Sequence, residues 1–176
     1  MKRRLVIKQV LIMAGGLALL PSCLKEAGKS TVLLKRISIN LDQENLLGEV
    51  AETMIPKTNT PGARELNIHL YVLKMLDDCY EETDQKKFIA GMEQFKDHVY
   101  DKTTKSFNKL SVFQRQSLLT ELENNKKTSP ELAAFYTIMK QRTIKGYLNS
   151  QYVMTNLVKW ELVPGRYNGY FPAKTA

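Results

Sequence analysis

The chain has 176 residues, with 26 Lys and Arg against 18 Asp and Glu and a formal charge of +8. Four of these bases and none of the acids lie in residues 1–22, so the other 154 residues carry 22 bases, 18 acids and a charge of +4. That remainder is long enough for one domain with a hydrophobic core. Its bases are scattered among acids without a basic stripe, which disfavours nucleic acid as a partner.

Residues 1–22 are expected to be a cleaved export signal. The bases Lys2, Arg3 and Arg4 precede Val10–Leu20, an apolar run of eleven residues. This run is too short to cross a hydrocarbon core of about 30 Å as a helix. Leu20-Pro21-Ser22-Cys23 then resembles a bacterial lipobox, which implies that Cys23 becomes the acylated first residue of the mature protein. An uncleaved anchor is the alternative.

The start of the signal also resembles a twin-arginine export motif, because Arg3-Arg4-Leu5-Val6-Ile7-Lys8 follows its pattern with aliphatic residues at the apolar positions. That route carries folded, often cofactor-loaded proteins, and a plain Sec signal is the alternative. Both routes predict an exported chain on the periplasmic side of a membrane, anchored through its lipid at Cys23.

The residues after Cys23 divide the chain further. Leu24–Ser30 is a short, mostly polar tether, and Thr31–Ile39 is expected to be a brief strand or an extended arm. The predicted organisation is therefore a signal over 1–22, a lipidated tether and arm over 23–40, and a helical domain over 41–176.

Two helices joined by an elbow begin that domain. Asn40 is placed to cap a helix over Leu41–Ile55, and an elbow rich in Pro and Gly covers residues 56–62. The second helix is expected over Ala63–Tyr80, with Thr60 as its N-cap and Pro61 as its first residue. Apolar residues cover more than half of its helical wheel, which predicts that it is the central helix of the domain.

Two chemically interesting residues fall on the apolar arc of that second helix. His69 is interpreted as a buried neutral imidazole bonded to a carbonyl or a side chain, and a ligand or proton-transfer role is the alternative. Cys79 is expected to be a buried, inert thiol. If Cys23 is acylated, no other cysteine is left for an intrachain disulfide. No Cys-x-x-Cys-His motif occurs, which excludes a covalent c-type haem.

Three more capped amphipathic helices are expected. Thr83 would cap a helix with an inner stripe of Phe88, Met92, Phe95 and Val99, while His98 would be exposed and not part of a metal site. Ser111 and Gln114 predict a capping box for a helix that ends near Leu122. Ser129 and Pro130 predict the start of a helix with the inner stripe Leu132, Phe135, Tyr136 and Met139. The predicted fold is all-α, a single-domain bundle of about five helices.

The tail is expected to differ from the bundle. A short helical piece, Gln151–Leu157, leads into Trp160–Pro172, which is rich in aromatic residues, Gly and Pro. Such a segment is too apolar to remain in water, so it is predicted to lie as an extended strap over the bundle or on a partner. Trp160 is assigned to the protein's own body. The candidate partner contacts are Arg166, Tyr167, Tyr170 and Phe171.

Several of these stretches together resemble a known family. They are the elbow Ile55-Pro56-Lys57-Thr58-Asn59-Thr60-Pro61-Gly62-Ala63, then His69, Asp77-Asp78-Cys79-Tyr80, Gly146-Tyr147 and Val163-Pro164-Gly165-Arg166-Tyr167-Asn168-Gly169. The pattern resembles the small subunit, subunit 3, of gluconate 2-dehydrogenase. Asn59 departs from it, because an Asp usually precedes Thr-Pro-Gly, and so does Tyr170, where a Cys often follows the last Gly.

The resemblance implies a helical accessory subunit without catalytic residues or a cofactor of its own. It would work with a large FAD-binding dehydrogenase of the glucose-methanol-choline type, from which a multihaem cytochrome c often accepts electrons. The expected function is export, folding and support of such a sugar or polyol dehydrogenase. Two alternatives are a self-standing helical lipoprotein that binds a ligand or another envelope protein, and a small enzyme that uses His69.

Overall fold

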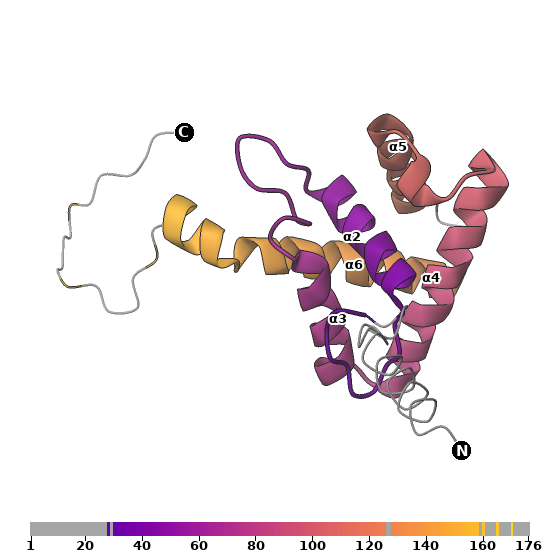
Figure 1. Cartoon of the computed structure of the whole chain (residues 1–176), viewed down its shortest axis with the longest axis horizontal. Helices are drawn as coiled ribbons and strands as arrows, with labels where there is room; N and C mark the ends of the chain where they lie inside the picture. The colour runs from indigo at the N-terminus through magenta and orange to yellow at the C-terminus, as the bar shows by residue number, and fades with distance from the viewer. Residues whose placement is uncertain are drawn as a thin grey trace, which may run out of the picture.

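The computed structural model describes residues 28, 30–125, 128–158, 160, 165 and 170. These ranges are helical and contain no strand, so the all-α prediction is confirmed (Figure 1). The elements are α2 (Leu41–Met54), α3 (Ile68–Cys79), α4 (Glu82–Thr103), the 3₁₀ turn η1 (Phe107–Lys109), α5 (Val112–Asn124), α6 (Pro130–Leu148) and the π-type turn η2 (Val153–Leu157).

Local capping signals set the start of three helices as predicted. Asn40 and Gln43 form a reciprocal capping box at α2, with the Gln43 amide donating to Asn40 Oδ1 at 2.8 Å. Ser111 and Gln114 form the same motif at α5. At α6 the Leu132 amide donates to Ser129 Oγ at 3.2 Å, and Pro130 occupies the first turn. Each cap satisfies backbone donors that would otherwise lack a partner at the helix start.

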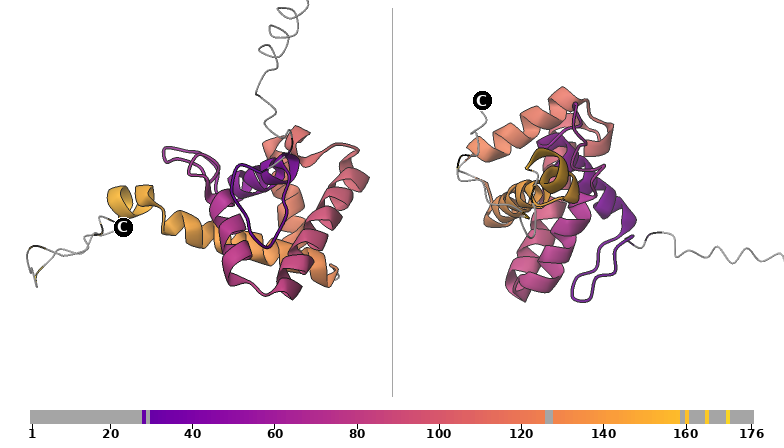
Figure 2. Two further views of the ribbon diagram at one scale, coloured as in Figure 1. Left: turned by 60° about the horizontal axis from the view of Figure 1, so that its bottom comes forward. Right: turned by 90° about the vertical axis from the view of Figure 1, so that its left-hand side faces the viewer.

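The centre of the bundle is α6, not the helix after the elbow. α6 contacts α2, α3, α4 and α5, and it packs most extensively against α4 (Figures 1 and 2). The expected central position of α3 was therefore wrong, because α3 buries one stripe and leaves its other face towards solvent. That stripe contains Ile68, His69, Val72, Leu73, Leu76 and Asp77.

Aromatic rings fill the contact between α4 and α6. Phe88 and Phe95 of α4 lie 5.1 Å and 5.4 Å, centroid to centroid, from Phe135 of α6. Phe107 of η1 continues the cluster, 5.2 Å from Phe95. The inner stripes predicted for these two helices are confirmed, with Tyr136 at the partly buried edge of its stripe. Burying such a side chain contributes about 1.5–3 kcal/mol.

The helix after the elbow begins later than predicted. Residues 63–67 form turns, α3 starts at Ile68, and Asn67 precedes it in a left-handed conformation with φ 54°. Thr60 is therefore not its N-cap and Pro61 is not its first residue. The cause lies outside the local sequence, since the Arg64 amide donates to the Glu52 carboxylate on α2 and the Ala63 amide donates to the Ile55 carbonyl. These bonds hold the chain in a turn where capping signals alone favoured a helix.

Other boundaries differ by a few residues. Glu81, not Thr83, precedes α4, and α5 continues to Asn124. α6 continues through Gly146 to Leu148, so it includes residues that were assigned to the tail. Cys79 is exposed, which corrects the expected buried thiol. It ends α3, where the apolar arc of the sequence is no longer covered by another helix.

The arm before α2 is an extended loop that folds back on the bundle. Its two ends are joined by backbone hydrogen bonds from Leu41 to Gly28 (2.9 Å) and from Ser30 to Ile39 (3.3 Å). Ile39 is buried in the core, and Val32, Leu34 and Ile37 pack against the core from the outside. The segment is an Ω-loop, a compact surface loop whose ends are close together.

Candidate partner-binding site

The elbow between α2 and α3 is held in shape by one carboxylate. Glu52 of α2 accepts hydrogen bonds from the backbone amides of Lys57 and Arg64, both at 2.9 Å. Gly62 lies directly against this carboxylate, and a Cβ added there would come within 2.7 Å of Glu52 Cδ. Gly62 is therefore required by the close approach of Glu52, a contact that no local sequence signal indicated.

The C-terminal end of α6 contacts the same elbow. The Tyr147 hydroxyl donates to the Pro61 carbonyl at 3.0 Å and lies 3.2 Å from Thr60 Oγ1. At Gly146 the helix lies so close to α3 that an added Cβ would come within 2.6 Å of the Tyr71 ring. Two motifs that are far apart in the sequence, Thr-Pro-Gly and Gly-Tyr, thus form one contact.

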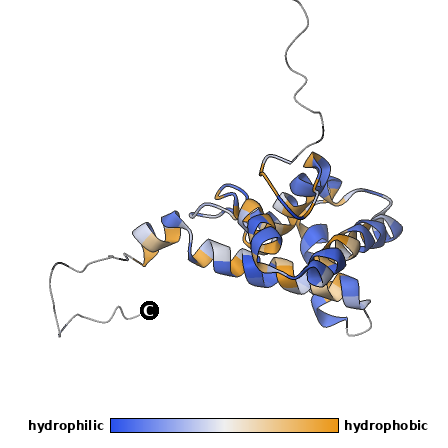
Figure 3. Cartoon of the chain, turned by 90° about the horizontal axis from the view of Figure 1, so that it is seen from below, coloured by the Kyte–Doolittle hydropathy of each residue, from blue (hydrophilic) through white to orange (hydrophobic). Residues whose placement is uncertain are grey.

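Beyond this contact the chain extends away from the bundle. The end of α6 and η2 project to one side, and turns of high hydropathy lie along them (Figures 1 and 3). Five large apolar side chains on this segment are between 41% and 59% exposed: Ile144, Leu148, Leu157, Val158 and Trp160. We call residues 144–158 together with Trp160 the C-terminal projection. Trp160, which was expected on the protein's own body, is 54% exposed.

His69 lies between α2 and α3 and is buried as predicted. Its ring packs over Gly48, where an added Cβ would lie 3.6 Å from His69 Cδ2. Nδ1 is buried without a hydrogen-bond partner among the described residues. Burial lowers the pKa of the imidazole, nearby Glu44 opposes that shift, and the Arg64 guanidinium adds to it. This environment favours the neutral ring.

An ion-pair network that includes Arg64 lies beside His69. Glu49 of α2 pairs with Arg64, which follows the elbow, and with Arg115 of α5. Arg115 also donates to the carbonyls of Phe107 (3.1 Å) and Asn108 (2.7 Å). The network joins the elbow, α2, α5 and η1. Neither Glu49 nor Arg115 was singled out from the sequence, because their partners are far away along the chain.

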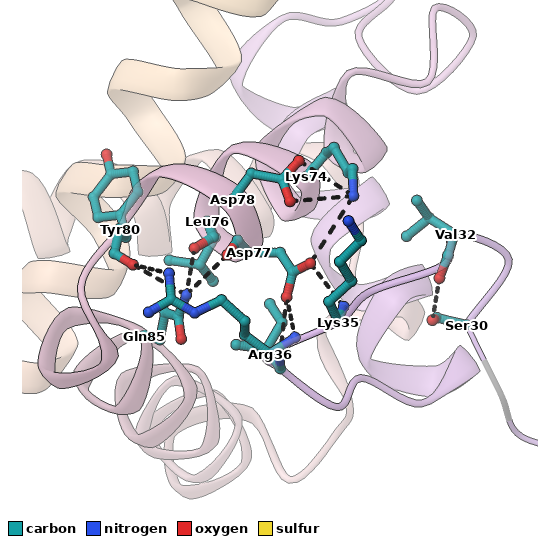
Figure 4. A network of polar contacts seen from close by, with 11 residues as sticks. Ser30, Val32, Lys35, Arg36, Lys74, Leu76, Asp77, Asp78, Tyr80 and Gln85 are labelled. Atoms are coloured by element: carbon teal, nitrogen blue, oxygen red, sulfur yellow. Dashed lines mark hydrogen bonds and ion pairs between the residues drawn. The ribbon is translucent and has the colours of Figure 1, made fainter.

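The Asp77-Asp78-Cys79-Tyr80 motif at the end of α3 fixes the arm. Asp77 is fully buried, and its carboxylate accepts the backbone amides of Lys35, Arg36 and Ile37 at 2.8, 2.7 and 3.0 Å (Figure 4). Burial alone would raise the pKa of Asp77, but these three donors, with Lys74, lower it below the ordinary value. Asp77 is therefore a charged anchor for the arm.

Two further contacts complete this end of the bundle. Gln85 of α4 donates from its side-chain amide to the carbonyls of Leu76 (2.9 Å), Asp77 (3.1 Å) and Tyr80 (3.1 Å), so it caps the end of α3. Arg142 of α6 donates to the Tyr80 hydroxyl at 2.7 Å and stacks over its ring. At the other end of the arm, buried Glu44 accepts the amide and the hydroxyl of Thr31, both at 2.6 Å.

Several predicted site residues cannot be placed in this arrangement. Arg3, Arg4, Cys23, Arg166, Tyr167 and Phe171 lie outside the described residues. Tyr170 is described and is 96% exposed. His98, expected to be exposed, is half-buried, and its Nε2 has no hydrogen-bond partner within the described part.

Two features are absent from the described part of the chain. Among its residues, no three His, Cys, Asp or Glu side chains lie where they could share a metal ion. No described helix combines the length and the apolar character needed to span a bilayer.

Comparisons with known proteins match one family. The family model for gluconate 2-dehydrogenase subunit 3 matches residues 41–165, which is more than half of the chain. No curated protein and no solved structure matches the chain significantly. The matched range covers the elbow, the Asp-Asp-Cys-Tyr motif and the contact between Tyr147 and the elbow. The chain therefore belongs to the gluconate 2-dehydrogenase subunit 3 family.

Proposed function

We propose that this chain is a non-catalytic small subunit that assists the export and folding of an FAD-dependent dehydrogenase of the glucose-methanol-choline type. The observation that carries the proposal is the family match over residues 41–165, since a member of a subunit family is expected to assemble with a larger protein. The exposed apolar side chains of the C-terminal projection support it, because such a surface is typical of protein contacts.

The redox chemistry is assigned to the partner. The sequence has no dinucleotide-binding fingerprint and no Cys-x-x-Cys-His motif. We therefore place the FAD in the large subunit and the sugar or polyol substrate beside it. In this proposal a cytochrome c subunit receives the electrons, and this chain supports the complex.

A location for the complex is part of the proposal and rests on the first 23 residues of the sequence. We propose that Arg3 and Arg4 direct twin-arginine export and that Cys23 carries the lipid that anchors the mature chain on the periplasmic side of a membrane. The paired arginines and the lipobox-like Leu20-Pro21-Ser22-Cys23 support this assignment. Mass spectrometry of the N-terminal peptide tests it. An unmodified Cys23, or a chain that still begins at Met1, would contradict the proposed anchor.

The experiment that tests the function is co-expression with an FAD-binding dehydrogenase subunit from the same organism. The full chain, tagged at its C-terminus, is purified in detergent and analysed by size-exclusion chromatography with flavin absorbance. The proposal predicts that the two chains elute together with bound flavin. If the chain elutes alone and the flavoprotein is stable without it, the self-standing lipoprotein is the better account.

A further inference from the structure

We propose that the C-terminal projection is the surface on which the FAD-binding dehydrogenase subunit docks. This inference rests on the proposed function and names the part of the chain that performs it. It concerns the exposed residues Ile144, Leu148, Leu157, Val158 and Trp160.

The first argument is that the projection has few buried side chains among the described residues. After Tyr147, which contacts the elbow, only Val153 is buried among the described residues. A helical segment of this length is only marginally stable in water without tertiary contacts. The exposed Leu, Val and Trp side chains also leave apolar surface in unfavourable contact with water. A partner that covers them stabilises both the helix and the complex.

The second argument is that the family's own motif residues build the base of the projection. Tyr147 bonds to the elbow at Pro61, and Gly146 lets α6 approach Tyr71 of α3. These contacts fix the direction in which α6 leaves the bundle (Figure 1). The family match continues past them to residue 165, so it includes the projection. The occupant we assign is the large dehydrogenase subunit of the proposed function, since the matched family is by its description one subunit of a dehydrogenase.

The third argument is the charge of the segment. The projection contains one base, Lys145, and no acid. An apolar surface with a basic neighbour fits a partner surface that is apolar at its centre and acidic at its rim. Ile144 also lines a groove on the bundle with Met54 of α2 and Leu119 of α5, among otherwise mostly polar residues.

A second exposed apolar pair provides a matched control. Val112 and Phe113, at the start of α5, are 62% and 77% exposed. They lie outside the projection and have exposures at least as large as those of Leu157 and Val158. Serine substitutions at either pair remove similar apolar surface without touching a buried residue.

The test measures the affinity of the full detergent-solubilised chain for the purified FAD-binding subunit. Leu157→Ser with Val158→Ser is expected to raise the Kd at least about tenfold, as contacts at the centre of an interface do. Val112→Ser with Phe113→Ser is expected to change it less than about threefold. Circular dichroism melting of both variants tests whether each keeps the wild-type fold. If the projection variant melts early, Lys145→Glu replaces it, with an expected loss of at least about threefold at low salt.

The outcomes separate the two proposals. Unchanged binding by the projection variant, or an equal loss in the α5 variant, would overturn the assignment of this surface while leaving the proposed function intact. Failure of the wild-type chain to bind the flavoprotein would instead contradict the proposed function.

Discussion

The hydroxyl of Tyr147 and the carbonyl of Pro61, 86 residues apart in the chain, are joined by a hydrogen bond of 3.0 Å. The bond ties the end of α6 to the elbow between α2 and α3. It relates two sequence motifs that carry the family resemblance, the Thr-Pro-Gly elbow and Gly146-Tyr147. Together with Glu52, it gives the elbow a defined shape at the base of the C-terminal projection.

Removing this hydroxyl should weaken the elbow contact. Tyr147→Phe loses the bonds to Pro61 and Thr60 while keeping the ring, so the free energy of unfolding should fall by about 1 kcal/mol. Urea denaturation followed by circular dichroism measures this change. Tyr100→Phe is the control, because Tyr100 is 61% exposed and lies far from the elbow in the chain. Equal effects of the two substitutions would contradict the role of Tyr147.

A methyl group at Gly62 should displace the carboxylate that holds the elbow. Gly62→Ala places its Cβ against Glu52, so the backbone bonds to Lys57 and Arg64 are strained. We expect a loss of about 1–3 kcal/mol in the free energy of unfolding. Gly165→Ala is the control, since a Cβ there meets nothing within 4 Å. A Gly62→Ala protein as stable as the wild type would show that the elbow tolerates a different shape.

Asp77 should be the most sensitive carboxylate among those described here. Asp77→Asn replaces one acceptor oxygen by a donor that faces three backbone amides, so we expect a loss of about 3 kcal/mol. Asp78→Asn, which removes only an exposed ion pair with Lys74, should cost less than about 1 kcal/mol. Thermal unfolding of both variants gives the comparison, and similar losses would contradict the anchoring role of Asp77.

The same group predicts a pH dependence. The pKa of Asp77 is lower in the folded chain than its ordinary value of 3.8. Its contribution to stability is therefore present above that value and is lost as the pH falls through the lower folded pKa. The difference in stability between the wild type and Asp77→Asn should shrink on acidification below about pH 4. A difference that stays constant there would mean that the charge of Asp77 does not hold the arm.

His69 predicts a second loss of stability on acidification, at a pH closer to neutral. Its pKa is lowered in the folded chain, so below the ordinary value of 6.5 the unfolded chain takes up a proton before the folded chain does. Stability should therefore fall between about pH 7.5 and pH 5.5, and His69→Gln should reduce that slope. Urea midpoints measured across this range provide the test. A variant with the wild-type slope would assign the pH dependence to other groups.

The sequence predicted features that depend on neighbouring residues. The cap at Asn40, the capping box at Ser111 and the start of α6 at Ser129 and Pro130 need only three or four residues in a row. The stripes of Phe88 and Phe135 follow from helical period alone. These local patterns are sufficient to predict an all-α fold without any tertiary contact.

The errors arose where a distant residue decides the outcome. Thr60 and Pro61 have the local pattern of a helix start, but Glu52 on another helix holds the chain in a turn. Cys79 lies on an apolar arc whose final turn no neighbour covers. The central position of α6 depends on packing with four other helices, and the hydropathy of α3 carried no information about it.

The most direct test of the central claim is the amount of exported, flavin-loaded dehydrogenase in cells that lack this chain. The account predicts that deletion strongly lowers FAD-dependent dehydrogenase activity in the envelope fraction and that the wild-type gene restores it. It also predicts that Arg3→Lys with Arg4→Lys restores it poorly. Undiminished activity and normal export of the flavoprotein after deletion would contradict the claim that this chain supports it.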